Sequence, residues 1–117
     1  MNIYDTANRL AGEIRNSDEC KELARLREAA YADETNRALL KEYKKLQLQL
    51  QMSMTGAAGK MPDEEMKRFQ QLATLLYMNQ DVQTYLLAEM QMQKTLADVF
   101  KILSDAAGLS LELPDGV

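Results

Sequence analysis

The stretch Asp81–Gly108, DVQTYLLAEMQMQKTLADVFKILSDAAG, decides the fold of this chain. It holds no proline and no glycine before Gly108, so nothing interrupts a helix of roughly 40 Å. Its apolar side chains spread over roughly 200° of the helix surface, and most of its polar side chains gather on the remainder. An apolar face this wide needs several neighbouring helices. We expect some of them to come from a second chain.

Apolar rows with spacings of three and four residues precede this stretch and predict four more helices. Asn16 or Ser17 suits the N-cap of the second helix, and Asp33 is either an N-cap or a bend before the third. The glycines and proline of residues 56–62 predict a turn between the third helix and the fourth. The rows are Ile3, Ala7, Leu10 and Ile14; Cys20, Leu23, Leu26 and Ala30; Leu39, Tyr43, Leu46 and Leu50; and Met66, Phe69, Ala73 and Leu76.

These helices predict an all-α fold, a left-handed antiparallel bundle of five helices of which two are long. Residues 1–108 would form a single helical domain and residues 109–117 a flexible C-terminal tail. Short loops place the third, fourth and fifth helices side by side. The fourth is too short to cover both long helices, so exposed apolar ends predict a homodimer, with a higher oligomer as the alternative.

Composition narrows the class of protein. The 117 residues include no histidine, which excludes Ser-His-Asp and Cys-His catalysis and removes the commonest metal ligand. The single cysteine, Cys20, excludes an intramolecular disulfide. We interpret it as a small buried hydrophobic residue, in preference to a reactive thiol. The sequence has neither a signal-peptide pattern nor a membrane-spanning apolar run, so we expect a cytoplasmic protein.

A basic stripe runs along the third predicted helix, where Arg37, Lys41, Lys44 and Lys45 fall within about 100° of arc. It would dock an acidic protein or RNA, or simply be a solvated helix face. The net charge of −4 and the lack of aromatic residues in the stripe disfavour RNA. Met52 and Met54 follow on the same helix and either extend this surface as an adaptable partner groove or fill the core.

One polar group interrupts the apolar face of the last helix. Glu89 and Gln93 point into that face, and Tyr85 lies one turn before Glu89, where it can hydrogen-bond the carboxylate. The cluster is a perturbed acid, a polar cluster that binds a partner, or a structural hydrogen bond at a helix crossing or dimer axis, and we favour the structural interpretation. Catalysis by Glu89 and Tyr85 is the weakest hypothesis. We expect no catalytic, metal or cofactor-binding residues.

The order and spacing of these residues resemble the YlbF/YmcA family of small helical bacterial proteins, and within it the YheA-type branch. The resemblance covers nearly the whole chain and implies an all-helical protein that self-associates and is not an enzyme. Some members support ribonuclease-mediated RNA maturation and developmental control, and carry C-terminal cysteines linked to iron–sulfur binding. This chain has no cysteine after Cys20. The matching segments are Ile3 to Ile14; Ser17 and Glu19; Leu23 and Leu26; Asp33; Leu39 to Gln51; Gly56 to Glu65; Asn79 to Glu89; and Ile102 to Gly108.

Together these observations predict a non-enzymatic regulatory adaptor that acts through an unidentified protein partner and does not bind membranes. An RNA-binding accessory protein that uses the basic stripe is the alternative.

Overall fold

The computed structural model describes residues 2–56 and 59–109, and these form five helices and no strand. The helices are α1 (Ile3–Arg15), α2 (Asp18–Ala32), α3 (Glu34–Met54), α4 (Asp63–Tyr77) and α5 (Gln80–Ala107). The predicted all-α class is confirmed, and α3 and α5 are the two long helices, with 21 and 28 residues. The predicted tail lies, apart from Leu109, outside the described residues.

Side-chain caps fix where four of the helices begin. In each cap a side-chain oxygen accepts a hydrogen bond from a backbone N–H of the first turn, which has no partner within the helix. Ser17, not Asn16, caps α2, because its hydroxyl accepts a 3.2 Å hydrogen bond from the N–H of Cys20. Asp33 is an N-cap and accepts from the N–H of Asn36 at 2.8 Å. The four caps are Asn2, Ser17, Asp33 and Asn79.

Glycines end the two long helices. After α3, Gly56 has a φ of 77°, a left-handed backbone conformation that residues other than glycine rarely adopt. After α5, Gly108 has a φ of 73°. The N–H groups of Gly108 and Leu109 donate to the carbonyls of Asp105 and Ser104 at 3.1 and 2.9 Å, the pattern of a Schellman cap.

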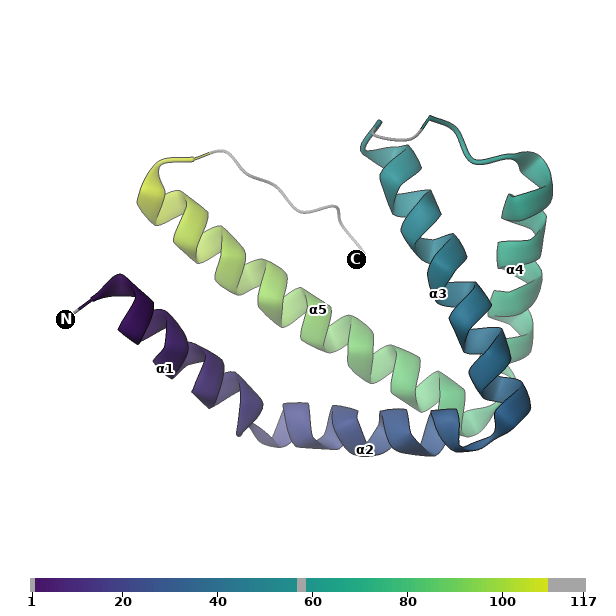
Figure 1. Ribbon diagram of the computed structural model, residues 1–117, viewed down its shortest axis with the longest axis horizontal. Helices are drawn as coiled ribbons and strands as arrows, with labels where there is room; N and C mark the ends of the chain where they lie inside the picture. Colours follow the sequence, from purple (N-terminus) through teal and green to yellow (C-terminus); the bar gives the residue numbers. More distant parts are fainter. Residues whose placement is uncertain (1, 57–58, 110–117) are drawn as a thin grey trace.

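The helices form two arms that diverge from one corner (Figure 1). One arm is the antiparallel pair of α3 and α4. The other consists of α5 with α2 and α1 along it. The Cα atoms span 49 × 35 × 16 Å, so the molecule is no more than about two helices thick in its shortest direction.

This arrangement differs from the predicted bundle, in which α3, α4 and α5 lie side by side. α5 packs mainly against α2, and α3 packs mainly against α4. The aromatic rings help to fix these pairs. Tyr31 of α2 meets Tyr85 of α5 edge-on, with centroids 5.8 Å apart, and Tyr43 of α3 stacks on Phe69 of α4 at 5.0 Å. Each arm therefore buries its own apolar contacts, and the two arms share a core only at the corner.

The buried core is centred on that corner and extends along α3 and α4 to Met61, which precedes α4 at the far end of their arm. Leu40, Leu72 and Val82 are fully buried in this core, and they come from α3, α4 and α5. Cys20, at the other end of α2, is half-buried, so it is less enclosed than the sequence predicts. The core residues are Leu26, Ala30, Leu40, Tyr43, Leu46, Met61, Leu72, Leu76, Val82, Tyr85 and Leu86.

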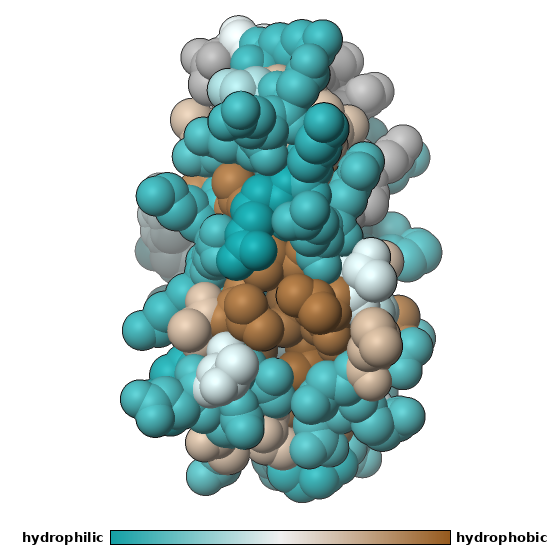
Figure 2. All heavy atoms as spheres, turned by 90° about the vertical axis from the view of Figure 1, so that its right-hand side faces the viewer, coloured by the Kyte–Doolittle hydropathy of each residue, from teal (hydrophilic) through white to brown (hydrophobic). Residues whose placement is uncertain are grey.

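Away from the corner, apolar side chains remain exposed. α1 has no buried residue, although Ile3, Ala7, Leu10 and Ile14 form the predicted row. On the α4 side of the molecule, Figure 2 shows apolar side chains gathered in a central patch that hydrophilic residues surround. No helix in the described ranges is long and apolar enough to cross a membrane.

Candidate sites: a polar joint and a basic helix face

Glu89 stands at the centre of a polar cluster that joins three helices. Its carboxylate accepts a 2.7 Å hydrogen bond from the Tyr85 hydroxyl, one turn earlier on α5, as the spacing predicts. On its other oxygen it accepts from Lys44 Nζ of α3. Arg27 of α2 lies 3.9 Å from the same carboxylate. We call Arg27, Lys44, Tyr85 and Glu89 the polar joint, because these residues connect the two arms next to the corner.

Two cations of the polar joint lie near the ring of Tyr85. Lys44 Nζ lies 5.1 Å from the ring centroid, and the guanidinium carbon of Arg27 lies 5.9 Å from it. Burial and the hydrogen bond to Glu89 raise the pKa of Tyr85, so its hydroxyl stays protonated and donates. The neighbouring Tyr85 hydroxyl raises the pKa of Arg27. Burial also raises the pKa of Tyr31.

This geometry is that of a compensated carboxylate. The side chain of Glu89 is 15% exposed, and a carboxylate so enclosed is costly unless it is paired and hydrogen-bonded. Two cations and a phenol meet that requirement. Gln93 lies half-buried one turn further along α5, next to the polar joint. The cluster is thus arranged to hold helices together.

The basic stripe of α3 is divided by this arrangement. Lys44 turns to Glu89, and Arg37 donates through Nε to the carbonyl of Tyr31 at 3.1 Å, which fixes the corner between α2 and α3. Lys41 and Lys45 are exposed. Three of the four predicted cations, Arg37, Lys41 and Lys45, are therefore exposed, and of these Arg37 is also hydrogen-bonded at the corner.

Two apolar side chains continue the same face of α3. Leu48 and Met52 are 57% and 42% exposed, and they follow Lys41 and Lys45 at helical spacings of three, four and seven residues. Met54 is also exposed, but two residues along a helix it points to the opposite side from Met52. We call Lys41, Lys45, Leu48 and Met52 the basic face. It combines two exposed positive charges with an uncovered apolar strip.

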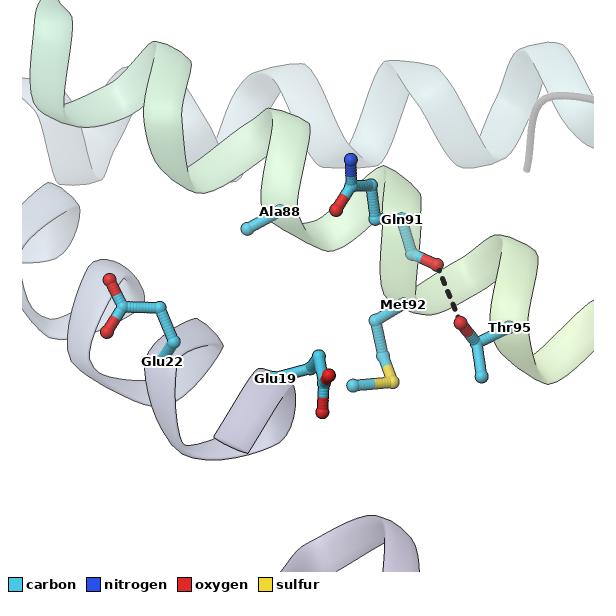
Figure 3. A pocket seen from close by; sticks show the side chains of 6 residues that line it. All are labelled: Glu19, Glu22, Ala88, Gln91, Met92 and Thr95. Atoms are coloured by element: carbon cyan, nitrogen blue, oxygen red, sulfur yellow. Dashed lines mark hydrogen bonds between the residues drawn. The ribbon is translucent and has the colours of Figure 1, made fainter. Parts of the chain in front are cut away.

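Two shallow pockets lie beside these features. One, of about 200 Å³, lies between the start of α2 and the middle of α5; Glu19 lies close to Met92 there, and Glu22 lines the pocket with its side chain turned away from Met92 (Figure 3). The other, of about 260 Å³, lies between α3 and α4, where Arg68 forms a bidentate ion pair with Glu42 at 2.8 Å. The Arg68 guanidinium lowers the pKa of Glu42. Neither pocket is enclosed, and within the described ranges no group of three or more acidic or cysteine side chains could hold a metal ion.

The sequence misses some members of both sites. Arg27 and Lys44 are 62 and 45 positions from Glu89, and nothing local indicates that they meet it. Leu48 offers a clearer signal, because it is an apolar residue off the Leu39–Leu50 row and on the line of Lys41 and Lys45.

Fold and sites define a small all-α protein with two diverging arms, a polar joint between them and a mixed basic and apolar face. The chain belongs to the YlbF/YmcA family: residues 3–106 match the family described as "Control of competence regulator ComK, YlbF/YmcA". The resemblance seen in the sequence is therefore confirmed at the level of the family, and the YheA-type branch stays a prediction.

Relatives and a solved structure agree with this assignment. A UPF0342 protein of Caldicellulosiruptor saccharolyticus is 31% identical over 96% of this chain and 92% of its own length. One from Halothermothrix orenii is 33% identical over 88% and 86%. The structure of a protein of unknown function (DUF964) from Bacillus stearothermophilus superposes with a TM-score of 0.74 and 24% identity, covering 91% of this chain and 92% of that one. That structure supports the fold alone.

Proposed function

We propose that this protein is a non-enzymatic regulatory adaptor, which works as a homodimer and binds another protein through the basic face of α3. The observation that carries the proposal is the basic face itself. Lys41, Lys45, Leu48 and Met52 share one side of a long helix, and all four are exposed. Apolar side chains that lie uncovered between charges are typical of a protein-binding surface.

The chemistry of the face indicates the kind of partner. Leu48 and Met52 would fit the apolar row of an amphipathic helix, and methionine adapts to different shapes. Lys41 and Lys45 would meet acidic residues beside that row and accelerate the encounter. The partner we expect is thus an acidic, amphipathic protein segment.

The family supports a regulatory role, since its description concerns the control of a competence regulator. The polar joint supports a role without catalysis, because its carboxylate already binds two cations and its phenol stays protonated.

The test is recovery of partners from the source cells with tagged protein, followed by mass spectrometry. Lys41→Glu/Lys45→Glu reverses the charge of the basic face and spares Lys44, which holds Glu89. Lys21→Glu/Lys67→Glu makes the same change in net charge on α2 and α4 and serves as the control. We expect a partner that binds the wild type and the control, and is lost with the basic-face variant.

Two results would reject the proposal. In one, the wild type recovers only itself. In the other, the basic-face variant keeps the partner as well as the control does. An electrophoretic shift of RNA at low salt that disappears with Lys41→Glu/Lys45→Glu would instead favour the RNA-binding alternative.

A further inference from the structure

α1 is a helix without sufficient cover from its own chain. Its principal neighbour is α2, none of its residues is buried, and Ile3 and Tyr4 are 83% and 76% exposed. Yet its apolar and polar residues separate cleanly onto two sides. An isolated helix of 13 residues is marginal in water, so packing must supply most of its stability. The apolar row of α1 therefore needs a partner whenever the helix is formed.

The second half of α5 has the same deficit. Between residues 93 and 107, Ser104 is the only buried residue, and Leu96 and Leu103 are 46% and 57% exposed. Leu96, Val99 and Leu103 follow one another at spacings of three and four, as in a coiled-coil seam. The charged residues stand on the other side of the helix and pair with each other, Lys94 with Asp98 and Lys101 with Asp105.

These two apolar rows lie in the same part of the molecule. Figure 1 shows the start of α1 and the end of α5 together at the tip of one arm, far from α3 and α4. We name α1 and residues 93–107 of α5 the tip surface.

The chain exposes more area than a compact monomer of its mass would. The chain exposes 8689 Å², whereas a compact monomer of 13.3 kDa exposes about 6,500 Å². The excess is about 2,200 Å², and an obligate homodimer buries roughly 1,000–2,500 Å² on each subunit. The excess belongs to both arms, and the tip surface supplies part of it, so the chain has enough uncovered surface for contact with one partner copy.

The charge of the tip surface also fits a second copy. α1 carries two acidic and two basic residues, and residues 93–107 of α5 carry two of each, so neither helix favours a strongly charged partner. α1 needs a packing partner whenever it is folded, and a second copy of the same protein is always present to supply one. Two-fold dimers are also the commonest assemblies. We propose that the tip surface binds the tip surface of a second copy, so that α1 and α5 of both chains form a four-helix contact.

This assignment rests on the homodimer of the proposed function and names where it forms. The competing surface is on the α4 side, where Figure 2 shows an apolar patch. In this part of the chain Leu75 and Met78 are 52% and 78% exposed. α4 already buries Leu72 and Leu76 against its own chain. It therefore has less need of a second copy than α1.

The first experiment measures mass by light scattering on a sizing column. We expect the wild type at twice 13.3 kDa. Leu96→Glu/Leu103→Glu places two carboxylates per chain in the contact and should weaken self-association by roughly 100-fold or more. Leu75→Glu is the matched control, an equally exposed leucine on α4, and should leave the dimer intact.

The second experiment does not depend on the folding of the charged variant. A photo-crosslinker is attached at position 103, through Leu103→Cys in a Cys20→Ser background, and at position 75 through Leu75→Cys as the control. We expect crosslinked dimers from position 103, with the linkage mapped by mass spectrometry to α1 or α5 of the other chain, and none from position 75.

The outcomes separate the two proposals. A wild-type mass of one chain removes the homodimer, and with it both this surface and that part of the proposed function. A dimer that crosslinks from position 75 and not from position 103, or that Leu75→Glu alone dissociates, overturns the tip surface and leaves the homodimer in place. Neither result affects the binding of a partner by Lys41 and Lys45.

Discussion

Replacing Glu89 by alanine should destabilise the protein by about 2–3 kcal/mol. The variant leaves the hydroxyl of Tyr85, a residue only 1% exposed, without its 2.7 Å acceptor, and an unsatisfied buried donor costs about 1–3 kcal/mol. It also removes the ion pair of Lys44. That side chain is 29% exposed and can turn to water, so the pair adds only about 0.5–1 kcal/mol. Glu89→Gln keeps a neutral acceptor and should cost about 1 kcal/mol.

Urea unfolding followed by circular dichroism measures this difference. All variants are compared at one protein concentration, because self-association makes apparent stability depend on concentration. A loss of 2–3 kcal/mol lowers the midpoint of thermal unfolding by about 8–12 °C for a chain of this length. Asp98→Ala is the control on the same helix. It breaks an exposed ion pair with Lys94, with side chains 62% and 76% exposed, and should cost no more than about 0.5 kcal/mol.

A loss for Glu89→Ala as small as that of Asp98→Ala would refute the reasoning, because it would show that the polar joint does not connect the arms. The pair itself is tested by a double-mutant cycle with Lys44→Met. We expect a coupling of about 0.5–1 kcal/mol, and strictly additive effects would contradict the contact between Glu89 and Lys44.

Two further predictions concern pH and the glycines. Burial raises the pKa of Tyr43 to about 12, so the folded state holds its proton more tightly than the unfolded state, whose tyrosine pKa is about 10. The resulting stability is complete below pH 10 and is lost as the pH rises towards 12; thermal midpoints across this range should show the loss, and Tyr43→Phe should diminish it. Gly12→Ala should stabilise α1 by about 0.5–1 kcal/mol, since a Cβ there meets nothing within 4 Å, whereas Gly108→Ala should destabilise α5 by about 1–2 kcal/mol because its φ is 73°. Amide hydrogen exchange of α1 and α5 measures the stability of each helix in the two variants. A change of the same sign in both helices would contradict the prediction.

The sequence predicts those parts of the fold that depend on local chemistry. Ser17 and Asp33 are short polar residues just ahead of apolar rows, and each caps a helix. The apolar rows identify five of the eleven described core residues, because a residue such as Leu46 or Leu76 repeats at the helical period whatever its neighbours are. These features need no knowledge of which helices meet.

The pairing of the helices is what the sequence does not determine. Every helix offers an apolar face, and the choice of α2 as the neighbour of α5 depends on how Tyr31 fits against Tyr85. For the same reason the stripe of cations looks uniform in the sequence. In the structure, Lys44 donates a hydrogen bond to Glu89, which lies 45 positions further along the chain on α5. Long-range contacts of this kind depend on shape, and single-sequence patterns carry no record of it.

The two arms also differ in when they can form during synthesis. α3 and α4 are adjacent in the chain, so the hairpin can assemble as soon as its second helix has left the ribosome. α2 must wait for α5, which is separated from it by the whole of that hairpin. Until α5 emerges, Leu26, Ala30 and Tyr31 lack their main partner. During that time α2 exposes apolar side chains, to which a chaperone or a neighbouring nascent copy would bind.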